Sequence, residues 1–178
     1  MWTKEIFGTD VYHLMAAFLL YSMIGWFLES AYITICNKKL TNRGFAKGPF
    51  CPIYGVGAVC CYLIMGPMRG HYLKIYFLGA FLATLFEFLV GKAMIRFLGA
   101  LWWDYNRKAF NYQGIICLES TIAWGFYALG VVYFVHDWVY RVIDSVSYSL
   151  GLRIVWILLF IAGVDYFMQL RKVFRTKS

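Results

Sequence analysis

Long apolar runs, each close to the length of a bilayer crossing, dominate the pattern of this chain. A helix needs about 20 residues to cross hydrocarbon, and four runs are of about this length: Val11 to Ile35, Tyr72 to Ile95, Gly114 to Val135, and Ile154 to Leu170. A fifth run, Cys51 to Gly66, is shorter and contains a proline and several glycines. We expect it to cross as an extended, tilted or broken helix, which gives five crossings.

The stretch from Asp137 to Leu150 is amphipathic. Val139, Val142 and Ile143 alternate with polar residues at helical spacing, which predicts a helix lying in the membrane interface. The alternative is a sixth, poorly inserted span, which would return the C-terminus to the other side. The expected fold is all-α: one polytopic membrane helix bundle over residues 1–178, with about five transmembrane helices plus an interfacial amphipathic helix.

The composition agrees with a membrane location. The chain of 178 residues is 62% hydrophobic, 21% aromatic and 15% charged, whereas a soluble domain is about 45–50% apolar and about 25% charged. So few charged residues could not cover a wetted surface. A soluble enzyme, a disordered tail and a nucleic-acid-binding module are excluded, and the expected surrounding is the lipid bilayer.

The 17 Lys and Arg residues against 9 Asp and Glu give a net charge of +8, and the basic residues flank the apolar runs. If the N-terminus is outside, Lys92 lies within a span and five basic residues fall outside. The other eleven fall inside: Lys38, Lys39, Arg43, Lys47, Arg96, Arg107, Lys108, Arg171, Lys172, Arg175 and Lys177. Because basic residues concentrate on the cytoplasmic side, we predict a prokaryotic plasma-membrane protein with its N-terminus outside and its C-terminus in the cytoplasm.

Four acidic residues interrupt the apolar runs, which is costly unless they are paired, protonated or hydrated: Glu29, Glu87, Glu119 and Asp165. Counted from the inner end of each run, all four lie about 8 to 12 Å deep at 1.5 Å per residue. The sequence therefore predicts one acidic layer in the cytoplasmic half, suited to binding a cation or an amine. The alternative is that each acid only ties helices together through hydrogen bonds.

Small residues share helix faces with these acids. Gly25 lies on the face of Glu29, Ala83 on that of Glu87, and Ala123 on that of Glu119. Small residues favour close helix contact, so we expect the acids to point inward, toward one another or toward a wet cavity.

The segment from Asn42 to Gly57, NRGFAKGPFCPIYGVG, joins the first two spans on the inner side. Its glycines and prolines disfavour regular structure over most of its length, and its free amides with Arg43 and Lys47 could hold an anionic group. Tyr54 is a further candidate for ligand binding. The alternative is a tight turn carrying ordinary positive-inside charge.

Two further groups of residues are candidates. Cys51, at the start of the short run, stands where a helix N-terminus can stabilise a thiolate, although we expect the five cysteines to be free thiols packed as small hydrophobes. Asp104 and Asn111 lie in the polar stretch Trp102 to Gly114. They could line the cytoplasmic opening to the predicted acidic layer or belong to an interfacial loop. We expect no metal ion and no cofactor.

Several segments in this order resemble the ABC-transporter type IV family, the CmpB-like membrane proteins: YSMIGWFLES, NRGFAKGPFCPIYGVG, the Glu87 region, WWDYN and FNYQGIICLES. The resemblance runs from about Tyr21 to Gly130, and GPFCPIYG is its most specific part. It implies a small multi-pass transporter or permease component and supplies no substrate or catalytic residue. The positions of Glu29, Glu87, Arg43 and Cys51 fit the family pattern, whereas that of Glu119 is often not acidic in relatives.

The sequence leaves three functions open. The first is transport of a cation, an amine or an amphipathic aromatic cation, bound chiefly by Glu29 and Glu87. Because the chain lacks the GxxxxGK[ST] motif, ATP hydrolysis would come from a separate ATPase subunit, and a homo-oligomer could complete the pathway. The second is a membrane enzyme acting on a lipid or isoprenoid phosphate, held by Arg43. The third is a non-catalytic assembly or sensor subunit.

Overall fold

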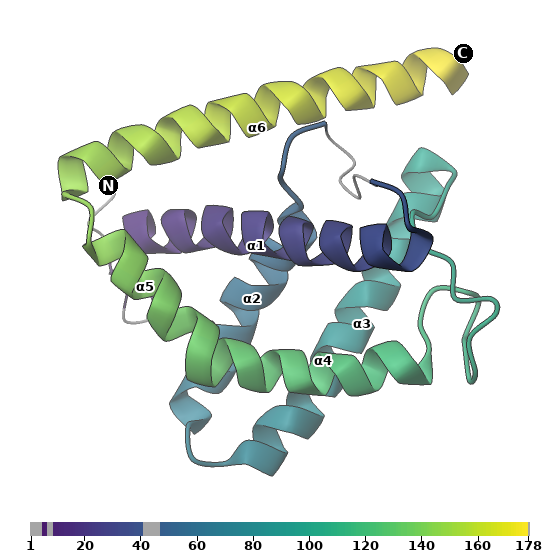
Figure 1. Cartoon of the computed structure of the whole chain (residues 1–178), viewed down its shortest axis with the longest axis horizontal. Coiled ribbons are helices and arrows are strands. Elements are labelled where there is room, and N and C mark those ends of the chain that lie inside the picture. Colours follow the sequence, from purple (N-terminus) through teal and green to yellow (C-terminus); the bar gives the residue numbers. More distant parts are fainter. Residues whose placement is uncertain (1–4, 7–8, 41–46, 178) are drawn as a thin grey trace. The chain divides into compact units, whose positions relative to one another are not determined.

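The computed structural model describes residues 5–6, 9–40 and 47–177. Apart from a minimal hairpin of two short strands, its regular elements are helices (Figure 1). In chain order they are β1 (Glu5–Ile6), β2 (Thr9–Asp10), α1 (Val11–Asn37), α2 (Pro52–Met65), η1 (Gly66–Met68), α3 (Tyr72–Leu98), α4 (Leu118–Gly130), η2 (Val131–Val135), α5 (His136–Asp144) and α6 (Tyr148–Lys177).

Among the described residues, four helices are long and apolar enough to cross a membrane: Val11–Ile35, Tyr72–Leu98, Leu118–Asp144 and Tyr148–Val173. A shorter apolar helix, Pro52–Met68, lies between the first two. The predicted all-α membrane bundle is therefore confirmed. The chain is an integral membrane protein, as its exposed apolar side chains, such as Phe160 at 73% and Phe167 at 65%, also require.

The amphipathic segment after Val135 is helical, but it continues the preceding helix to Asp144 before a turn leads into α6. The sequence has no proline or glycine between Val131 and Asp144, so no residue there ends the helix. The last predicted span likewise begins earlier than expected, at Tyr148.

A π-helical turn, η2, links α4 to α5. The backbone N–H of His136 donates to the carbonyl of Val131, five residues back, and so passes over the carbonyl of Val132. Arg69 satisfies that carbonyl, because its Nε donates to it at 3.0 Å. A backbone group released from the helix ladder thus keeps a partner where water is scarce.

Residue contacts divide the chain into two compact units. The first unit is Met1–Cys60 with Asp137–Ser178, and the second unit is Cys61–His136. That residues 1–178 form one membrane domain stays a prediction. Each unit is described by itself below.

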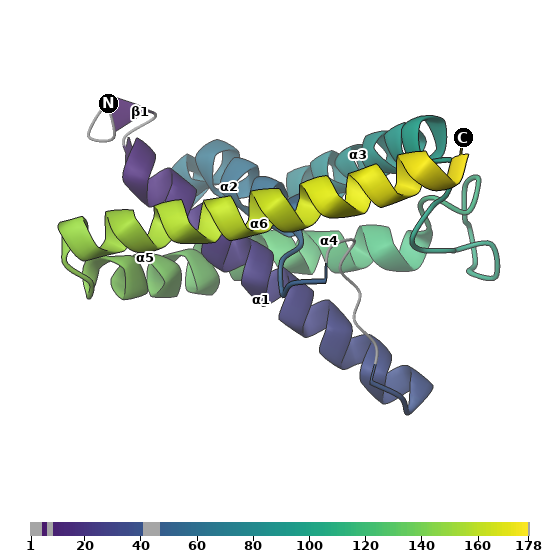
Figure 2. The same ribbon diagram turned by 90° about the horizontal axis from the view of Figure 1, so that it is seen from above.

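In the first unit, α1 and α6 run in the same direction, and their C-terminal ends diverge (Figures 1 and 2). The rings of Tyr12 and Tyr148 meet edge to face at a centroid distance of 4.9 Å where the two helices begin. A side chain on Gly151 would overlap the Tyr12 hydroxyl. The two helices therefore start at the same end of the first unit.

The second unit is built on an antiparallel pair, α3 and α4. Going forward along α3, Gly79, Thr84 and Glu87 meet residues that go backward along α4, namely Ala128, Thr121 and Ser120. A Cβ on Gly79 would overlap the Ala128 side chain. The absence of a side chain at this glycine allows the two helices their close approach.

Candidate functional site

Glu87, in the middle of α3, is buried at 5% exposure and accepts hydrogen bonds from three side chains. The Tyr105 hydroxyl donates to Oε1 at 3.1 Å. Ser120 Oγ donates to Oε2 at 3.2 Å, and Trp124 Nε1 donates to Oε2 at 3.0 Å. Bonds to a carboxylate are stronger than bonds between neutral groups, so these donors offset much of the cost of burying the acid.

Two of the three donors are placed by α4. Ser120 and Trp124 are four residues apart and so lie on one face of that helix. Cys117 caps the helix, because its Sγ accepts from the backbone N–H of Ser120 at 3.4 Å, while Ser120 Oγ accepts from the backbone N–H of Cys117 at 3.3 Å. This reciprocal cap fixes the Ser120 hydroxyl beside Glu87.

The third donor, Tyr105, is placed by the connection between α3 and α4. Its backbone N–H donates to the Gly114 carbonyl at 3.0 Å, which closes the loop. Asp104 and Asn111 stabilise the same loop: Asp104 Oδ1 accepts from the Asn106 backbone N–H at 2.8 Å, and Asn111 Nδ2 donates to the Lys108 carbonyl at 2.9 Å. Both are exposed, and a role for either in ligand binding stays a prediction.

The identity of the donors determines which oxygen of Glu87 can carry a proton. The indole N–H of Trp124 can only donate, so Oε2 must act as an acceptor there. The hydroxyl of Tyr105 can donate or accept. A proton on Glu87 therefore fits on Oε1, from which it would point to the Tyr105 oxygen, and the surroundings accommodate the acid in either protonation state.

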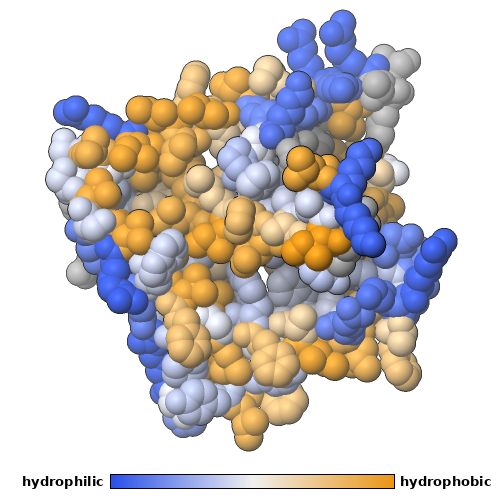
Figure 3. Space-filling model, viewed as in Figure 1, coloured by the Kyte–Doolittle hydropathy of each residue, from blue (hydrophilic) through white to orange (hydrophobic). Residues whose placement is uncertain are grey.

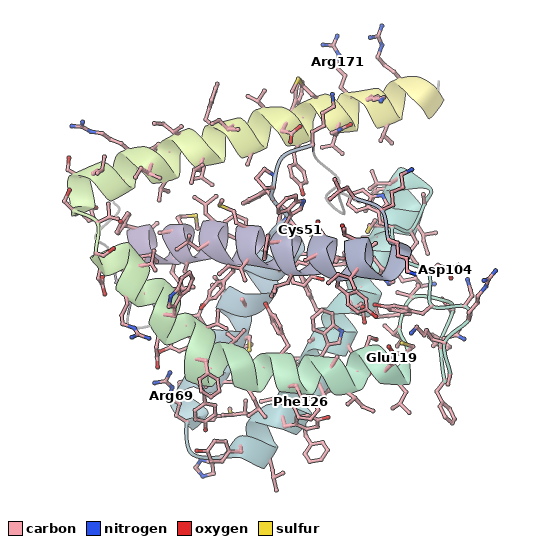
Figure 4. All side chains as sticks on the ribbon, in the orientation of Figure 1. Cys51, Arg69, Asp104, Glu119, Phe126 and Arg171 are labelled. Carbon is pink, nitrogen blue, oxygen red and sulfur yellow. The ribbon has the colours of Figure 1, made fainter. Side chains whose placement is uncertain are left out.

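Glu119 has different surroundings. Its side chain is 64% exposed in the first turn of α4 and forms an ion pair of 2.7 Å with Lys108. Ala123, expected to pack on the same face, is exposed as well, and Ser120, Trp124 and Ala128 face α3 instead. The structure thus differs from the expectation that Glu119 points inward on a packed face (Figure 4). Its role as a ligand-binding residue stays a prediction.

In the first unit, Asp165 of α6 holds the segment that precedes α2. Its Oδ2 accepts the backbone N–H of Gly48 at 2.7 Å. The neighbouring Tyr166 hydroxyl donates to the Phe50 carbonyl at 3.3 Å, and the Cys51 backbone N–H donates to the Ser22 carbonyl of α1 at 3.1 Å. Residues 48–51 are therefore bound on one side to α6 and on the other to α1.

These contacts bear on the expected anion site. The amides of Gly48 and Cys51 donate within the chain, and so does that of Phe50, which bonds the Gly48 carbonyl at 2.8 Å. The anionic group held by the described part of this segment is the carboxylate of Asp165. Lys47 is exposed, and Arg43 lies outside the described residues, so its binding role stays a prediction.

The remaining candidates of the first unit lie on or beside α1. Tyr54 packs its ring against Gly25 of α1, where a side chain on the glycine would overlap it. Cys51 directly precedes α2 (Figure 4). It is half-buried and, among the described residues, forms no disulfide. Glu29 is half-buried on α1. Ligand binding by these three residues stays a prediction.

The structure thus gives Glu87 and Asp165 well-defined partners, each within its own unit. That all four acids share one chamber stays a prediction. Sequence reasoning missed Tyr105, Ser120 and Trp124 as the partners of Glu87. The available signal was the pair of hydrogen-bond donors four residues apart on α4, since a buried indole N–H usually needs an acceptor.

Comparison with known proteins adds one finding. A family described as "Putative ABC-transporter type IV" matches residues 16–170, which is most of the chain. The comparisons with curated proteins and with solved structures gave no match.

Proposed function

The chain belongs to the ABC-transporter type IV family, and on that premise we propose that it is a membrane component of a transporter that binds a cationic ligand at Glu87. The single observation that carries the proposal is the Glu87 carboxylate, buried in a candidate membrane span among three oriented donors. Charged groups at such depth usually serve transport or coupling.

The surrounding side chains favour an amine or an amphipathic aromatic cation over a bare metal ion. Trp124 and Tyr105 are half-buried, and Trp124 meets Tyr127 edge to face at a centroid distance of 5.6 Å. The faces of aromatic rings attract organic cations at about 6 Å or less. An incoming cation would take over one oxygen of Glu87 from a hydroxyl donor while the Trp124 bond keeps the carboxylate oriented.

We also propose five crossings, with α2 as the fifth. Because α1 and α6 begin at the same end of the first unit, we infer that both begin at one face of the membrane. The chain between them must then make an odd number of crossings. The two long spans in between, Tyr72–Leu98 and Leu118–Asp144, are an even number, and Pro52–Met68 is the remaining apolar helix. Its 17 residues give about 25 Å at 1.5 Å per residue, close to the hydrocarbon thickness of about 30 Å.

This topology, together with the distribution of basic residues, places the N-terminus outside and the C-terminus in the cytoplasm. Energy for transport would come from a separate ATPase subunit. Single cysteines introduced at Lys47 and at Gly70, which flank α2, test the topology: a membrane-impermeant maleimide should reach them from opposite sides. Labelling from the same side would contradict the crossing by α2.

Binding of radiolabelled tetraphenylphosphonium to the full chain in lipid nanodiscs tests the ligand site. Glu87→Gln keeps the shape of the side chain but removes its charge, and we expect the affinity to fall by about tenfold or more, or about 1.4 kcal/mol. Asp144→Asn is the control, because Asp144 is an exposed acid for which no ligand binding is predicted, and it should change the affinity by no more than about twofold. Equal binding by the wild type and Glu87→Gln would overturn the site, and no binding by the wild type would overturn the aromatic-cation class.

A further inference from the structure

Basic side chains lie toward one end of the first unit, on segments whose ends diverge. Among the described residues they come from three segments, namely the end of α1, the segment before α2 and the end of α6, and all are exposed: Lys38, Lys39, Lys47, Arg171, Lys172 and Arg175. Figure 4 shows Arg171 extending away from α6. These basic side chains are therefore accessible at the surface of the unit.

Two sets of contacts place these segments at the same end. The starts of α1 and α6 meet through Tyr12 and Tyr148, and both helices run from there in the same direction (Figure 2). Farther along, Asp165 of α6 binds Gly48, the residue that follows Lys47. The C-terminal ends of both helices and Lys47 thus belong to one membrane face.

Among the described residues of the first unit, fewer acids than basic residues lie near this end. Asp165 lies six residues before Arg171, about 9 Å deeper along the helix, and its carboxylate binds the Gly48 amide. Glu29 lies nine residues before Lys38, about 13 Å deeper. Asp10 and Asp144 lie at the opposite end, where both contact His13. Positive charge therefore predominates at the end of the first unit that carries these six Lys and Arg residues, which we call the basic end.

The basic end also adjoins surface suited to acyl chains. Phe167, Met168 and Leu170 of α6 are exposed directly before Arg171. In the space-filling view, apolar side chains along α6 give way to hydrophilic ones at its C-terminal end (Figure 3). This is the boundary between hydrocarbon and headgroups that a phospholipid itself spans.

We propose that this basic end binds the phosphate headgroups of anionic phospholipids, with the acyl chains against the exposed apolar residues of α6. Arg171 and Arg175 are four residues apart, so both guanidinium groups lie on one helix face and can bind a phosphate through paired N–H donors. The positive-inside bias alone orients the chain and requires no preference between lipids, whereas this arrangement selects anionic headgroups.

Native mass spectrometry of the full chain, after equilibration in micelles with equal amounts of phosphatidylglycerol and phosphatidylcholine, tests the proposal. We expect the wild type to retain phosphatidylglycerol about fivefold or more over phosphatidylcholine, since each basic residue near an anionic surface contributes about 1 kcal/mol. Arg171→Gln/Arg175→Gln should lose most of this preference. Arg141→Gln/Arg153→Gln, with two exposed arginines of the same unit changed, should keep it.

Equal retention of the two lipids by the wild type would overturn the proposal, as would an unchanged preference in Arg171→Gln/Arg175→Gln. Lys38→Gln/Lys39→Gln is a second test pair in case the first does not fold, and it should weaken the preference in the same direction. Raising the salt concentration should also reduce the wild-type preference, because exposed charges are screened. Insensitivity to salt would contradict headgroup binding.

Discussion

The backbone N–H of Gly48 donates to Oδ2 of Asp165 at 2.7 Å across 117 positions of sequence. This bond ties the segment before α2 to α6. Without the Asp165 carboxylate, the segment loses this anchor, while its bonds to Ser22 and Tyr166 remain. Asp165 therefore acts on the position of the loop that carries Cys51.

Asp165→Ala should raise the rate at which maleimide modifies Cys51. Mass spectrometry of the peptide that contains Cys51 measures this rate. The half-buried amide of Gly48 loses an acceptor, which should also lower the free energy of unfolding by about 1–3 kcal/mol. Asp165→Asn keeps an oxygen acceptor and should give an intermediate rate. A wild-type rate in Asp165→Ala would show that the anchor does not hold the loop.

Trp124→Phe should lower the thermal stability of the protein. The substitution keeps an aromatic ring but removes the indole N–H that is bonded to Glu87. Loss of a hydrogen bond to a charged acceptor lowers the free energy of unfolding by about 1.5–3 kcal/mol. Trp138→Phe is the matched control, because Trp138 is 50% exposed. Thermal denaturation in detergent measures both, and equal shifts would contradict a specific role for the Trp124 bond.

His13 contacts two carboxylates, with Nδ1 2.8 Å from Asp10 and Nε2 3.0 Å from Asp144. Only the protonated ring can donate at both nitrogens. A double-mutant cycle of His13→Gln and Asp144→Asn should therefore give a coupling of about 0.5–1 kcal/mol in mildly acidic buffer. At alkaline pH the ring has one N–H, and the coupling should decrease; a coupling that does not depend on pH would contradict the doubly donating ring.

Gly79→Ala should destabilise the α3–α4 pair, because the added methyl group overlaps Ala128. Overpacking of this kind costs about 1–3 kcal/mol. Adding Ala128→Gly should restore much of the loss by removing the opposing methyl group. Gly163→Ala on α6 is the control, since no described atom beyond its chain neighbours and its own helix backbone lies within 4 Å of the added Cβ. Thermal denaturation of the wild type and these three variants checks the prediction, and no rescue by Ala128→Gly would contradict it.

The sequence predicted the helices better than the contacts between them. Apolar run length gave the span from Val11 to Ile35, where Asp10 caps α1 by accepting the His13 backbone N–H at 2.8 Å. Small residues correctly indicated that the Glu87 face of α3 is packed, with Ala80 and Gly91 buried. These features depend on local sequence, which explains why they could be predicted.

The expectation that small residues mark the packed face of a helix did not predict which face of α4 is packed. Ala123 is small, yet Trp124 faces Glu87, and Gly125 accommodates the ring of Tyr76. How a helix is rotated about its axis depends on partners distant in sequence. For the same reason, sequence did not reveal that the Gly48 amide would bind Asp165 rather than leave an open anion site.

The position of a bound cation relative to Glu87 tests the central claim most directly. Crystals of the full chain grown with tetraphenylarsonium, whose arsenic scatters anomalously, would locate the ligand without ambiguity about its identity. We predict an arsenic peak within about 6 Å of the Glu87 carboxylate, the range over which an opposite charge is strongly favoured, and its loss in Glu87→Gln. A peak elsewhere in the protein, or an unchanged peak in that variant, would contradict the proposed site.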